Sequence, residues 1–317
     1  MGGEKLPQRI VIASRESALA MWQARHIETR LAQLYPRAEI RVLGLTTEGD
    51  RRLDASLAKI GGKGLFVKEL EEALASGRAD IAVHSMKDLP MTLAREFALA
   101  AISEREDPRD AFVSNHFADL SELPAGGRVG TSSLRRECQL RARHPALRIE
   151  PLRGNVTTRL RKLDEGHFEA VILAAAGLKR LGLDARITRL LTPSESLPAP
   201  GQGALGLECL ARRSDLLESL AALNHAATAR CVAAERAFSR ALSGSCNVPL
   251  GAYAEADGRN IRLRGFVAAP DGSRVVSGEL KGAAGDPETL GATLAKGLKV
   301  QGAADILAEL ERQTAAR

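Results

Sequence analysis

The chain of 317 residues is poor in aromatic residues and in cysteine. Phe, Trp and Tyr make up 3% of it, too few for a platform on which nucleic-acid bases could stack. Its 4 cysteines form no C-x-x-C pair, so a zinc site is poorly supported. So few cysteines in so long a chain also argue against a disulfide framework. We therefore predict a fold without a metal, in a reducing compartment.

Long apolar runs and long charged runs are missing too. The apolar run 170–176 is far too short to span a bilayer, and the first residues lack the apolar region of a signal peptide. Leu6 stands where a myristoylation signal needs Ser or Thr. We expect a cytoplasmic protein that has no membrane partner.

What the chain does have is apolar content and positive charge. With 44% hydrophobic residues it can fill the cores of two or three domains. Its net charge of +6 and its pI of about 9.3 favour anionic partners, of which nucleic acid is one. The basic residues are dispersed, however, and no run of them is long enough to be a tail.

Strands and helices alternate over the first two thirds of the chain, which indicates right-handed βαβ units and mainly parallel sheets. A helix capped by Ser17 has the apolar face Ala20, Ala24, Ile27, Leu31 and Leu34, and further helices are predicted at 66–75 and after Ser133. Strands are predicted at 9–13, 40–43, 81–83, 111–113, 129–130, 170–173 and 204–209. The last hundred residues have a helix at 226–242, strands near 261–265 and 275–276 and a final helix, which suggests an α+β domain.

Asp88 is the most informative residue. It lies in the segment 84–90, directly after a predicted strand, and other loops of the chain carry basic residues beside small ones. A carboxylate that faces many cations suggests a site for a polyanion on which a positive centre develops. The alternative is a carboxylate that caps a helix or lies solvated at the surface, as most carboxylates do.

Two strand-to-helix junctions combine hydroxyl residues with arginines. In the segment 130–136 a strand leads into Thr131 and Ser133 and then into Arg135 and Arg136, and the segment 153–159 repeats this order. The N–H groups and the dipole of a helix N-terminus favour an anion, and arginines add bidentate recognition of carboxylates. The alternative at each junction is a capped helix with exposed arginines, but two such junctions favour an anion site.

Two glycine-rich segments and one loop complete the candidates. The segment 201–206 matches G-x-G-x-x-G, but a Pro-rich hinge precedes it and a strand follows it, so we do not predict a dinucleotide site. The polar, glycine-rich segment 46–64 suits a mobile lid or an ordinary surface loop equally well. Cys246 lies among small residues in the loop 243–249, which favours an approachable nucleophile or attachment point over an inert buried cysteine.

Taken together, these segments resemble the porphobilinogen deaminase family, also called hydroxymethylbilane synthases, over nearly the whole chain. The matching segments are 57–66, 84–90, 106–110, 130–136, 152–155, 176–180, 200–204 and 244–249. One departure lies at the cysteine loop, where the family more often has Glu-Gly-Gly-Cys and this chain has Ser243-Gly244-Ser245-Cys246. We expect this loop to keep its shape and the thiol its role, while the contacts of the lost glutamate change.

The resemblance implies three domains. Two are α/β domains that resemble the halves of a periplasmic-type binding protein, with mainly parallel sheets and two crossovers between them. The third is an α+β domain that carries the cysteine. The expected boundaries are 1–103 with 204–221, then 109–197, then 226–317, in a monomeric protein.

The resemblance also implies the chemistry. Cys246 holds a dipyrromethane cofactor through a thioether, and the enzyme makes this cofactor from its own substrate. Four porphobilinogen molecules lose ammonia and join head-to-tail on the cofactor, and the product hydroxymethylbilane is released for heme biosynthesis. Loss of ammonia leaves an azafulvenium-like cation, which the catalytic residue Asp88 would stabilise.

Further site residues are implied by their matching positions. The cofactor would contact Ser85, Lys87, Thr131, Ser133, Arg135, Arg136, Arg159 and Gly177. The substrate would contact Arg15, Ser17, Phe66, Arg153, Arg180 and Gln202. Lys59 and Lys63 would lie on the candidate lid over the site.

Two other classes of function remain as alternatives. A non-enzymatic binding protein for a small carboxylate or oxyanion would use the same two-lobed pattern and hinge. The missing export signal and the C-terminal cysteine domain argue against it. A nucleic-acid-binding protein would suit the pI, but the low aromatic content and the confinement of the arginines to strand-to-helix junctions argue against it.

Overall fold

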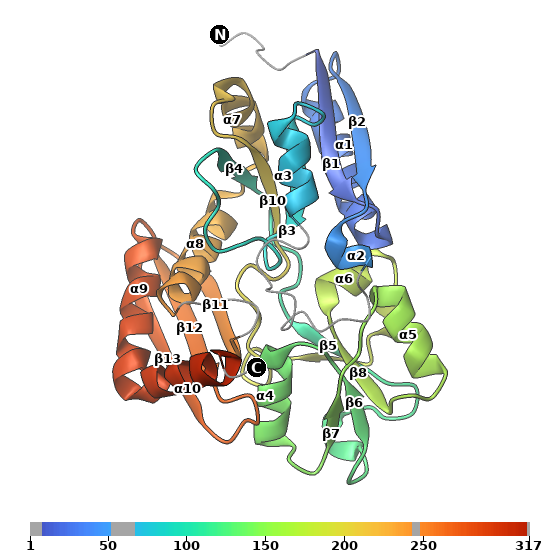
Figure 1. Ribbon diagram of the computed structural model, residues 1–317, viewed down its shortest axis with the longest axis vertical. Coiled ribbons are helices and arrows are strands. Elements are labelled where there is room, and N and C mark those ends of the chain that lie inside the picture. Colours follow the sequence, from blue (N-terminus) through green and yellow to red (C-terminus); the bar gives the residue numbers. More distant parts are fainter. Residues whose placement is uncertain (1–7, 52–66, 243–247, 316–317) are drawn as a thin grey trace. The chain divides into compact units, whose positions relative to one another are not determined.

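The computed structural model describes residues 8–51, 67–242 and 248–315 and divides into two units (Figure 1). The first unit comprises the described residues up to 106 together with 204–229. The second unit comprises 107–203 and the described residues from 230 onward. No helix in the described part of the chain is both long enough and apolar enough to cross a membrane.

The first unit contains a five-stranded sheet that is covered by helices on both faces (Figure 1). Its strands, in spatial order, are β2 (Glu39–Leu45), β1 (Arg9–Arg15), β3 (Ile81–Ser85), β10 (Leu205–Leu210) and β4 (Phe97–Ile102). Of these strands, β1, β2 and β3 run parallel, and β10 is antiparallel to both of its neighbours. Helices α1 (Ala18–Leu34) and α7 (Ser214–Leu220) pack on one face, and α3 (Lys68–Ala75) packs on the other.

The second unit contains a sheet of the same pattern. Its strands, in spatial order, are β7 (Arg148–Glu150), β6 (Arg128–Gly130), β8 (Ala170–Ala174), β5 (Asp110–Val113) and β9 (Arg189–Leu191). Here β6, β7 and β8 are parallel, and β5 is the antiparallel strand in the fourth place. Helix α4 (Leu134–Arg143) covers one face, and α5 (Val156–Asp164) and α6 (Ala175–Arg180) cover the other.

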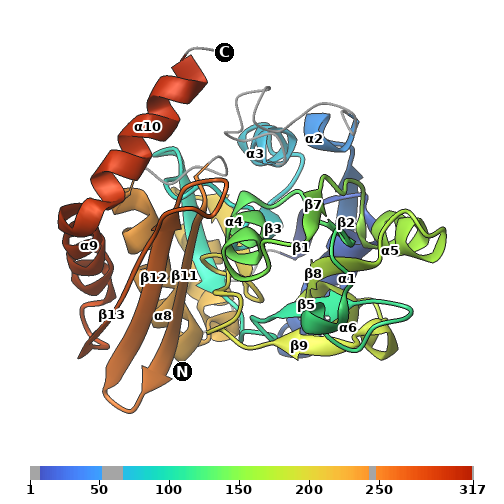
Figure 2. The same cartoon turned by 90° about the horizontal axis from the view of Figure 1, so that it is seen from below.

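The C-terminal part of the second unit is an antiparallel sheet packed against helices (Figure 2). Its strands are β11 (Leu250–Asp257), β12 (Asn260–Ala268) and β13 (Val275–Ala283). Helices α8 (Ala226–Ala241), α9 (Pro287–Leu298) and α10 (Ala304–Ala315) contribute to one core with this sheet. Shorter helical segments of the chain are α2 (Glu48–Arg51), 120–122, 184–186, 221–223 and the π-turn 299–303.

This architecture confirms the predicted fold class, two mainly parallel α/β sheets with an α+β domain. The sequence prediction gave no range for β4, β7, β9 and β11 and placed a single helix at the C-terminus. Gly302 divides that helix into α9 and α10, since its φ of 109° is a left-handed conformation that favours glycine. Leu34 was expected on a buried face but is 43% exposed, because it is the last residue of α1, beyond the fully buried Leu31.

Gly291 marks a close approach of two helices in the C-terminal domain. A Cβ at this position of α9 would collide with the carbonyl oxygen of Ala234 and lie 2.7 Å from the backbone nitrogen of Phe238, both on α8. Backbone atoms cannot move aside as side chains can, so Gly291→Ala should destabilise the protein by about 1–3 kcal/mol. Gly297→Ala is the matched control, because its Cβ meets no atom within 4 Å and alanine is the better helix former. Thermal unfolding of the two variants should show a lowered Tm for the first alone, and equal Tm values would contradict the close-packing argument.

Candidate active site

The carboxyl ends of three parallel strands meet at one edge of the first sheet. Arg15 ends β1, Ser85 ends β3, and Thr47 and Asp50 follow β2. Lys87 and Asp88 lie in the turn directly after β3. This edge is where open α/β sheets bind their ligands, and the fold brings the predicted site residues of the first unit together there.

Arg15 is held by a carboxylate of its own chain. Its Nε donates to Oδ2 of Asp50 at 3.0 Å, and its Nη2 forms an ion pair with the other oxygen. The hydroxyl of Thr47 donates to the same carboxylate at 2.7 Å. Burial alone would raise the pKa of Asp50, but the hydrogen bonds from Arg15 and Thr47 lower it. Asp50 therefore orients the guanidinium at the sheet edge.

The two predicted serines of this edge have defined partners. Ser17 caps α1, as expected, with its Oγ accepting from the N–H of Ala20 at 3.4 Å. The Oγ of Ser85 accepts from the side-chain amide of Gln23 at 2.9 Å. Among the described residues neither hydroxyl donates a hydrogen bond, so each keeps its own hydrogen to donate to an anion.

Asp88 is presented outward by a well-anchored turn. Its N–H donates to the carbonyl of Ser85 at 2.9 Å, and the flanking Met86 and Leu89 are buried. The Asp88 side chain is exposed, and within residues 8–51, 67–242 and 248–315 it has neither a hydrogen bond nor an ion pair. No helix begins at this turn, since the next element is β4. The helix-capping alternative for Asp88 is therefore wrong.

The second sheet repeats this arrangement at the carboxyl ends of β6, β7 and β8. Thr131 and Ser133 lie between β6 and α4, and the Oγ1 of Thr131 accepts from the N–H of Ser133 at 3.2 Å. Ser133 occupies the N-cap position of α4, but its side chain does not cap the helix. Both hydroxyl residues thus lie at this helix N-terminus, as the sequence predicts.

Arg135 and Arg136, on the first turn of α4, both bind Asp110, the first residue of β5. Arg135 donates to the two carboxylate oxygens at 2.8 and 3.1 Å, and Arg136 donates to one of them from Nε at 3.1 Å and from Nη2 at 2.7 Å. The two arginines are 6% and 5% exposed, and Asp110 is fully buried. Burial alone would raise the pKa of Asp110, but the two arginines hold it well below its usual range.

The junction after β7 presents Arg153 and Arg159. Gly154 has a φ of 110°, and a Cβ there would lie 2.7 Å from the side chain of Thr158, so this tight turn requires glycine. Asn155 caps α5 by accepting from the N–H of Thr158 at 2.8 Å. The Nε of Arg159 donates back to the carbonyl of Gly154 at 2.8 Å, which directs its side chain to the start of the helix.

The remaining predicted residues of the second unit follow β8 or precede β10. Gly177 is buried in α6, and Arg180 at the end of that helix donates to the carbonyl of Gly203 at 2.6 Å. The amide of Gln202 donates to Asp110 at 2.9 Å and to the carbonyl of Pro108 at 2.6 Å. Gly203 is followed by the strand β10 and not by a helix, which confirms that the G-x-G-x-x-G match is no dinucleotide site.

Four predicted residues lie outside the described part of the chain. They are Lys59 and Lys63 of the candidate lid, the predicted substrate contact Phe66, and Cys246. The other three cysteines, Cys138, Cys209 and Cys231, are buried. Burial raises the pKa of the Cys138 thiol to about 12 and that of Cys209 to about 11. Because the thiolate is the reactive form, burial makes these two poor attachment points.

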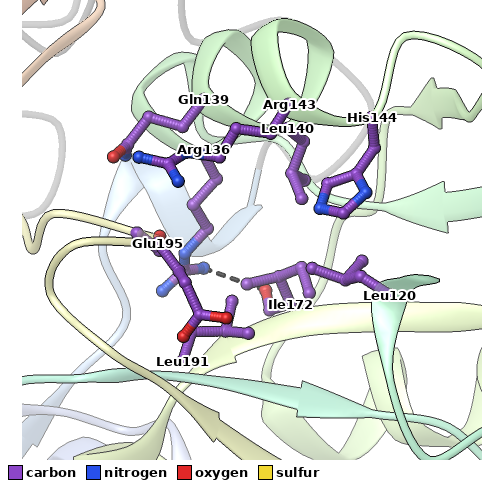
Figure 3. Close-up of a pocket in the computed structure, with 10 residues that line it drawn as sticks. Leu120, Arg136, Gln139, Leu140, Arg143, His144, Ile172, Leu191 and Glu195 are labelled. Atoms are coloured by element: carbon purple, nitrogen blue, oxygen red, sulfur yellow. Dashed lines mark hydrogen bonds between the residues drawn. The ribbon is translucent and has the colours of Figure 1, made fainter.

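A pocket in the second unit borders the arginine cluster on one side. Figure 3 shows Arg136, with its hydrogen bond to the carbonyl of Ile172, among side chains of α4 and of the segment 191–196. Of the described residues predicted to bind the substrate, none lines this pocket.

The sequence prediction missed the aspartates that hold these cations. Asp50 orients Arg15, Asp110 orients Arg135 and Arg136, and Asp107 binds Arg109 and Lys179 at 2.8 and 3.0 Å. The signal was present in the segment 106–110, where two aspartates flank an arginine just before a strand. Apart from Arg109, their cationic partners lie 25 or more residues away in sequence and could not be assigned to them.

Two sheet edges that each gather hydroxyls and arginines define a class of α/β protein suited to an anionic ligand, here extended by an α+β domain. A family model described as porphobilinogen deaminase, dipyromethane cofactor binding domain, matches residues 10–218. A second one, described as the C-terminal domain of porphobilinogen deaminase, matches residues 229–300. The chain belongs to the porphobilinogen deaminase family.

Individual relatives agree with this assignment. A porphobilinogen deaminase of Nitrosomonas europaea is 64% identical over 304 residues, which cover 96% of this chain and 99% of the relative. One of Chromobacterium violaceum is 63% identical over 300 residues, or 95% and 97% of the two chains. Among solved structures, a nutrient binding protein from Burkholderia cenocepacia bound to methionine has 12% identity and a TM-score of 0.44, covering 67% of this chain and 89% of its own, a likeness too weak to bear on the assignment.

The family assignment settles the activity. The chain is a transferase that forms hydroxymethylbilane from porphobilinogen on a dipyrromethane cofactor, in tetrapyrrole biosynthesis. The two alternatives, a non-enzymatic binding protein and a nucleic-acid-binding protein, are therefore wrong. The cation-rich donor set of the two sheet edges suits a group that carries several carboxylates, so the residues present fit the dipyrromethane.

Proposed function

We propose that the two sheet edges bind the carboxylates of the cofactor and of the growing chain. We further propose that Asp88 is the catalytic residue in the conversion of porphobilinogen to hydroxymethylbilane. The observation that carries this proposal is which carboxylates at the sheet edges are paired with arginines and which are not. Asp50 and Asp110 are engaged by arginines, whereas Asp88 is exposed and unpaired within the described residues. Asp88 is thus a carboxylate at these edges that is available to a ligand.

The proposed binding residues divide into two sets by the ligand that each would contact. For the cofactor we propose Ser85 and Lys87 after β3 together with Thr131, Ser133, Arg135, Arg136, Arg159 and Gly177 of the second unit. For the substrate we propose Arg15, Ser17, Arg153, Arg180 and Gln202, with Phe66 beside them and Lys59 and Lys63 on the lid. When bound, the dipyrromethane supplies the pyrrole end to which substrate units are added. The chain's own residues bind carboxylates, orient the rings and balance charge.

Asp88 would act on the positive charge that develops in the substrate as ammonia leaves. A carboxylate fixed by a turn with two buried anchors needs little reorganisation to stabilise that charge. The same oxygens can accept the N–H groups of pyrrole rings and help to move a proton. The exposure of the side chain supports this role, because the group must meet the reacting atoms directly.

We assign the covalent anchor to Cys246. The burial of Cys138, Cys209 and Cys231 supports this choice by elimination. We further propose that the protein is a cytoplasmic monomer. The domain boundaries 1–103 with 204–221, 109–197 and 226–317 also stay a prediction.

Intact mass spectrometry of the purified protein, before and after addition of porphobilinogen, tests the proposal directly. The untreated protein should carry the mass of one dipyrromethane, and added substrate should raise the mass in steps of one pyrrole unit. A protein without any adduct that forms none on addition of substrate would contradict it.

Arg135→Leu should reduce the turnover of porphobilinogen about tenfold to hundredfold, the effect of losing one or two hydrogen bonds to a charged group. Thermal stability should fall little at matched cofactor occupancy, because Asp110 keeps Arg136 as a neutralising partner. Arg135→Lys should restore activity only in part, since an ammonium lacks the planar fork of a guanidinium.

Arg141→Leu is the matched control for this prediction. Arg141 lies on the same helix, is 38% exposed and pairs with Glu137 one turn away. Its replacement should leave turnover unchanged. A fall in Tm of Arg135→Leu that accounts for the whole loss of activity would show that Arg135 serves the fold and not the ligand.

A further inference from the structure

Asp110 is saturated with hydrogen bonds from its own chain. Besides the four from Arg135 and Arg136, its oxygens accept from the hydroxyl of Ser196 at 2.7 Å and from the amide of Gln202 at 2.9 Å. A carboxylate offers about four lone-pair sites, so no capacity is left for a ligand. Because Asp110 is also fully buried, it cannot touch the substrate.

The cluster nevertheless carries a surplus of one positive charge. One carboxylate faces two guanidiniums, and the charged groups that shift the pKa of Arg136 are Asp110 and Arg135. Burial lowers the pKa of Arg136, which shows that water compensates its charge poorly. A buried net charge that is only partly neutralised is costly, so an anion supplied from outside would be stabilised here.

Asp110 also fixes where these guanidiniums lie. It starts β5 at the register position of Ala174, the last residue of β8, so it lies at the carboxyl edge of the sheet. The carbonyl oxygens of Leu197 and Ile172 accept further hydrogen bonds from Arg135 and Arg136. The two side chains thus have a defined orientation before any ligand binds, which lowers the entropic cost of binding.

We infer that Asp110 is a positioning residue for anion binding, which holds Arg135 and Arg136 side by side and leaves one positive charge of the pair for a carboxylate of the cofactor. This inference rests on the proposed function, in which both arginines bind the dipyrromethane. Without Asp110 the two guanidiniums, on consecutive residues, would repel each other in a buried place. The cofactor's carboxylate can replace part of the missing negative charge. The thermal stability of the cofactor-free protein should therefore depend on Asp110 more than that of the loaded protein does.

The test measures Tm for Asp110→Asn with and without the cofactor. Asp110→Asn is made in two backgrounds. Cys246→Ala gives the cofactor-free form, and the protein with Cys246 intact, after incubation with porphobilinogen, gives the loaded form. In the cofactor-free form Asp110→Asn should lower Tm by about 6 °C or more, as expected for one partner lost from a buried ion pair. In the loaded form the loss should be less than half as large.

Ser196→Ala is the matched control, because it removes one hydrogen bond to the same carboxylate and no charge. It should lower Tm equally in both forms. Equal losses for Asp110→Asn in the two forms would overturn the inference and leave Asp110 a residue of the fold alone. A folded Asp110→Asn protein that takes up no dipyrrole, beside a Ser196→Ala protein that does, would support the inference.

A second variant covers the case in which Asp110→Asn does not fold. Asp110→Asn combined with Arg136→Gln restores the surplus to one positive charge, so the double variant should be more stable than the single one. A double variant that is no more stable overturns the inference. Failure of the proposed function is recognised separately, because Arg135→Leu would then turn over porphobilinogen as fast as its control Arg141→Leu.

Discussion

Cys246→Ala should yield a folded protein that carries no dipyrromethane and forms no hydroxymethylbilane. The cofactor is proposed to be held by a carbon–sulfur bond at this position, and no other cysteine can replace it. Cys138 and Cys209 are buried with thiol pKa values raised to about 12 and about 11, and Cys231 is 6% exposed. Loss of the Cys246 thiol should therefore remove the attachment chemistry altogether.

The measurement combines intact mass, peptide mapping and the colour reaction of dipyrroles with an acidic aldehyde reagent. The wild-type adduct should map to the peptide that contains Cys246, and the variant should give no colour. Cys231→Ala is the matched control and should keep the adduct, since the same atom is removed from a buried site. An adduct that maps to Cys138, Cys209 or Cys231 would refute the assignment.

The fold class could be predicted because buried strands and amphipathic helices leave a strong pattern. Strands such as β1 and β3 are short apolar runs bounded by polar turns, and α1 has its cap at Ser17 as expected. The missed strand β7 has three residues, of which Ile149 alone is buried, so it leaves no pattern of its own. Tertiary pairing with β6 makes it a strand.

The candidate site could be predicted in part for a similar reason. Residues that follow the parallel strands of one sheet gather at one edge, so Thr131 and Arg153 of the second sheet could be grouped from the strand pattern alone. The partners of the arginines could not be predicted. Asp110 meets Arg135 across 25 residues and Ser196 across 86, and only the folded sheet brings them together. A sequence also does not distinguish the engaged carboxylate of Asp110 from the exposed one of Asp88.

Asp88→Asn should slow the release of ammonia from porphobilinogen at least a hundredfold, which corresponds to ~2.7 kcal/mol of barrier, the cost of losing one electrostatic group in an active site. The amide keeps the size and most of the hydrogen bonding but removes the negative charge that stabilises the developing cation. The fold should be unaffected, because the Asp88 side chain is exposed and has no partner among the described residues. Asp88→Glu should retain more activity than Asp88→Asn, since it keeps the charge and displaces it by one methylene.

Single-turnover release of ammonia from folded, cofactor-loaded variants is the decisive measurement, because it separates chemistry from cofactor assembly and from product release. Glu218→Gln is the matched control. It removes an exposed carboxylate from α7, which follows the end of the antiparallel strand β10 and so starts at the edge opposite Asp88. Its rate should equal that of the wild type. A near-normal rate for Asp88→Asn, at the same occupancy and Tm as the control, would reduce Asp88 to a solvated surface carboxylate and leave the developing cation to another group. The hundredfold loss, with Tm unchanged, would instead locate the chemistry at the turn after β3.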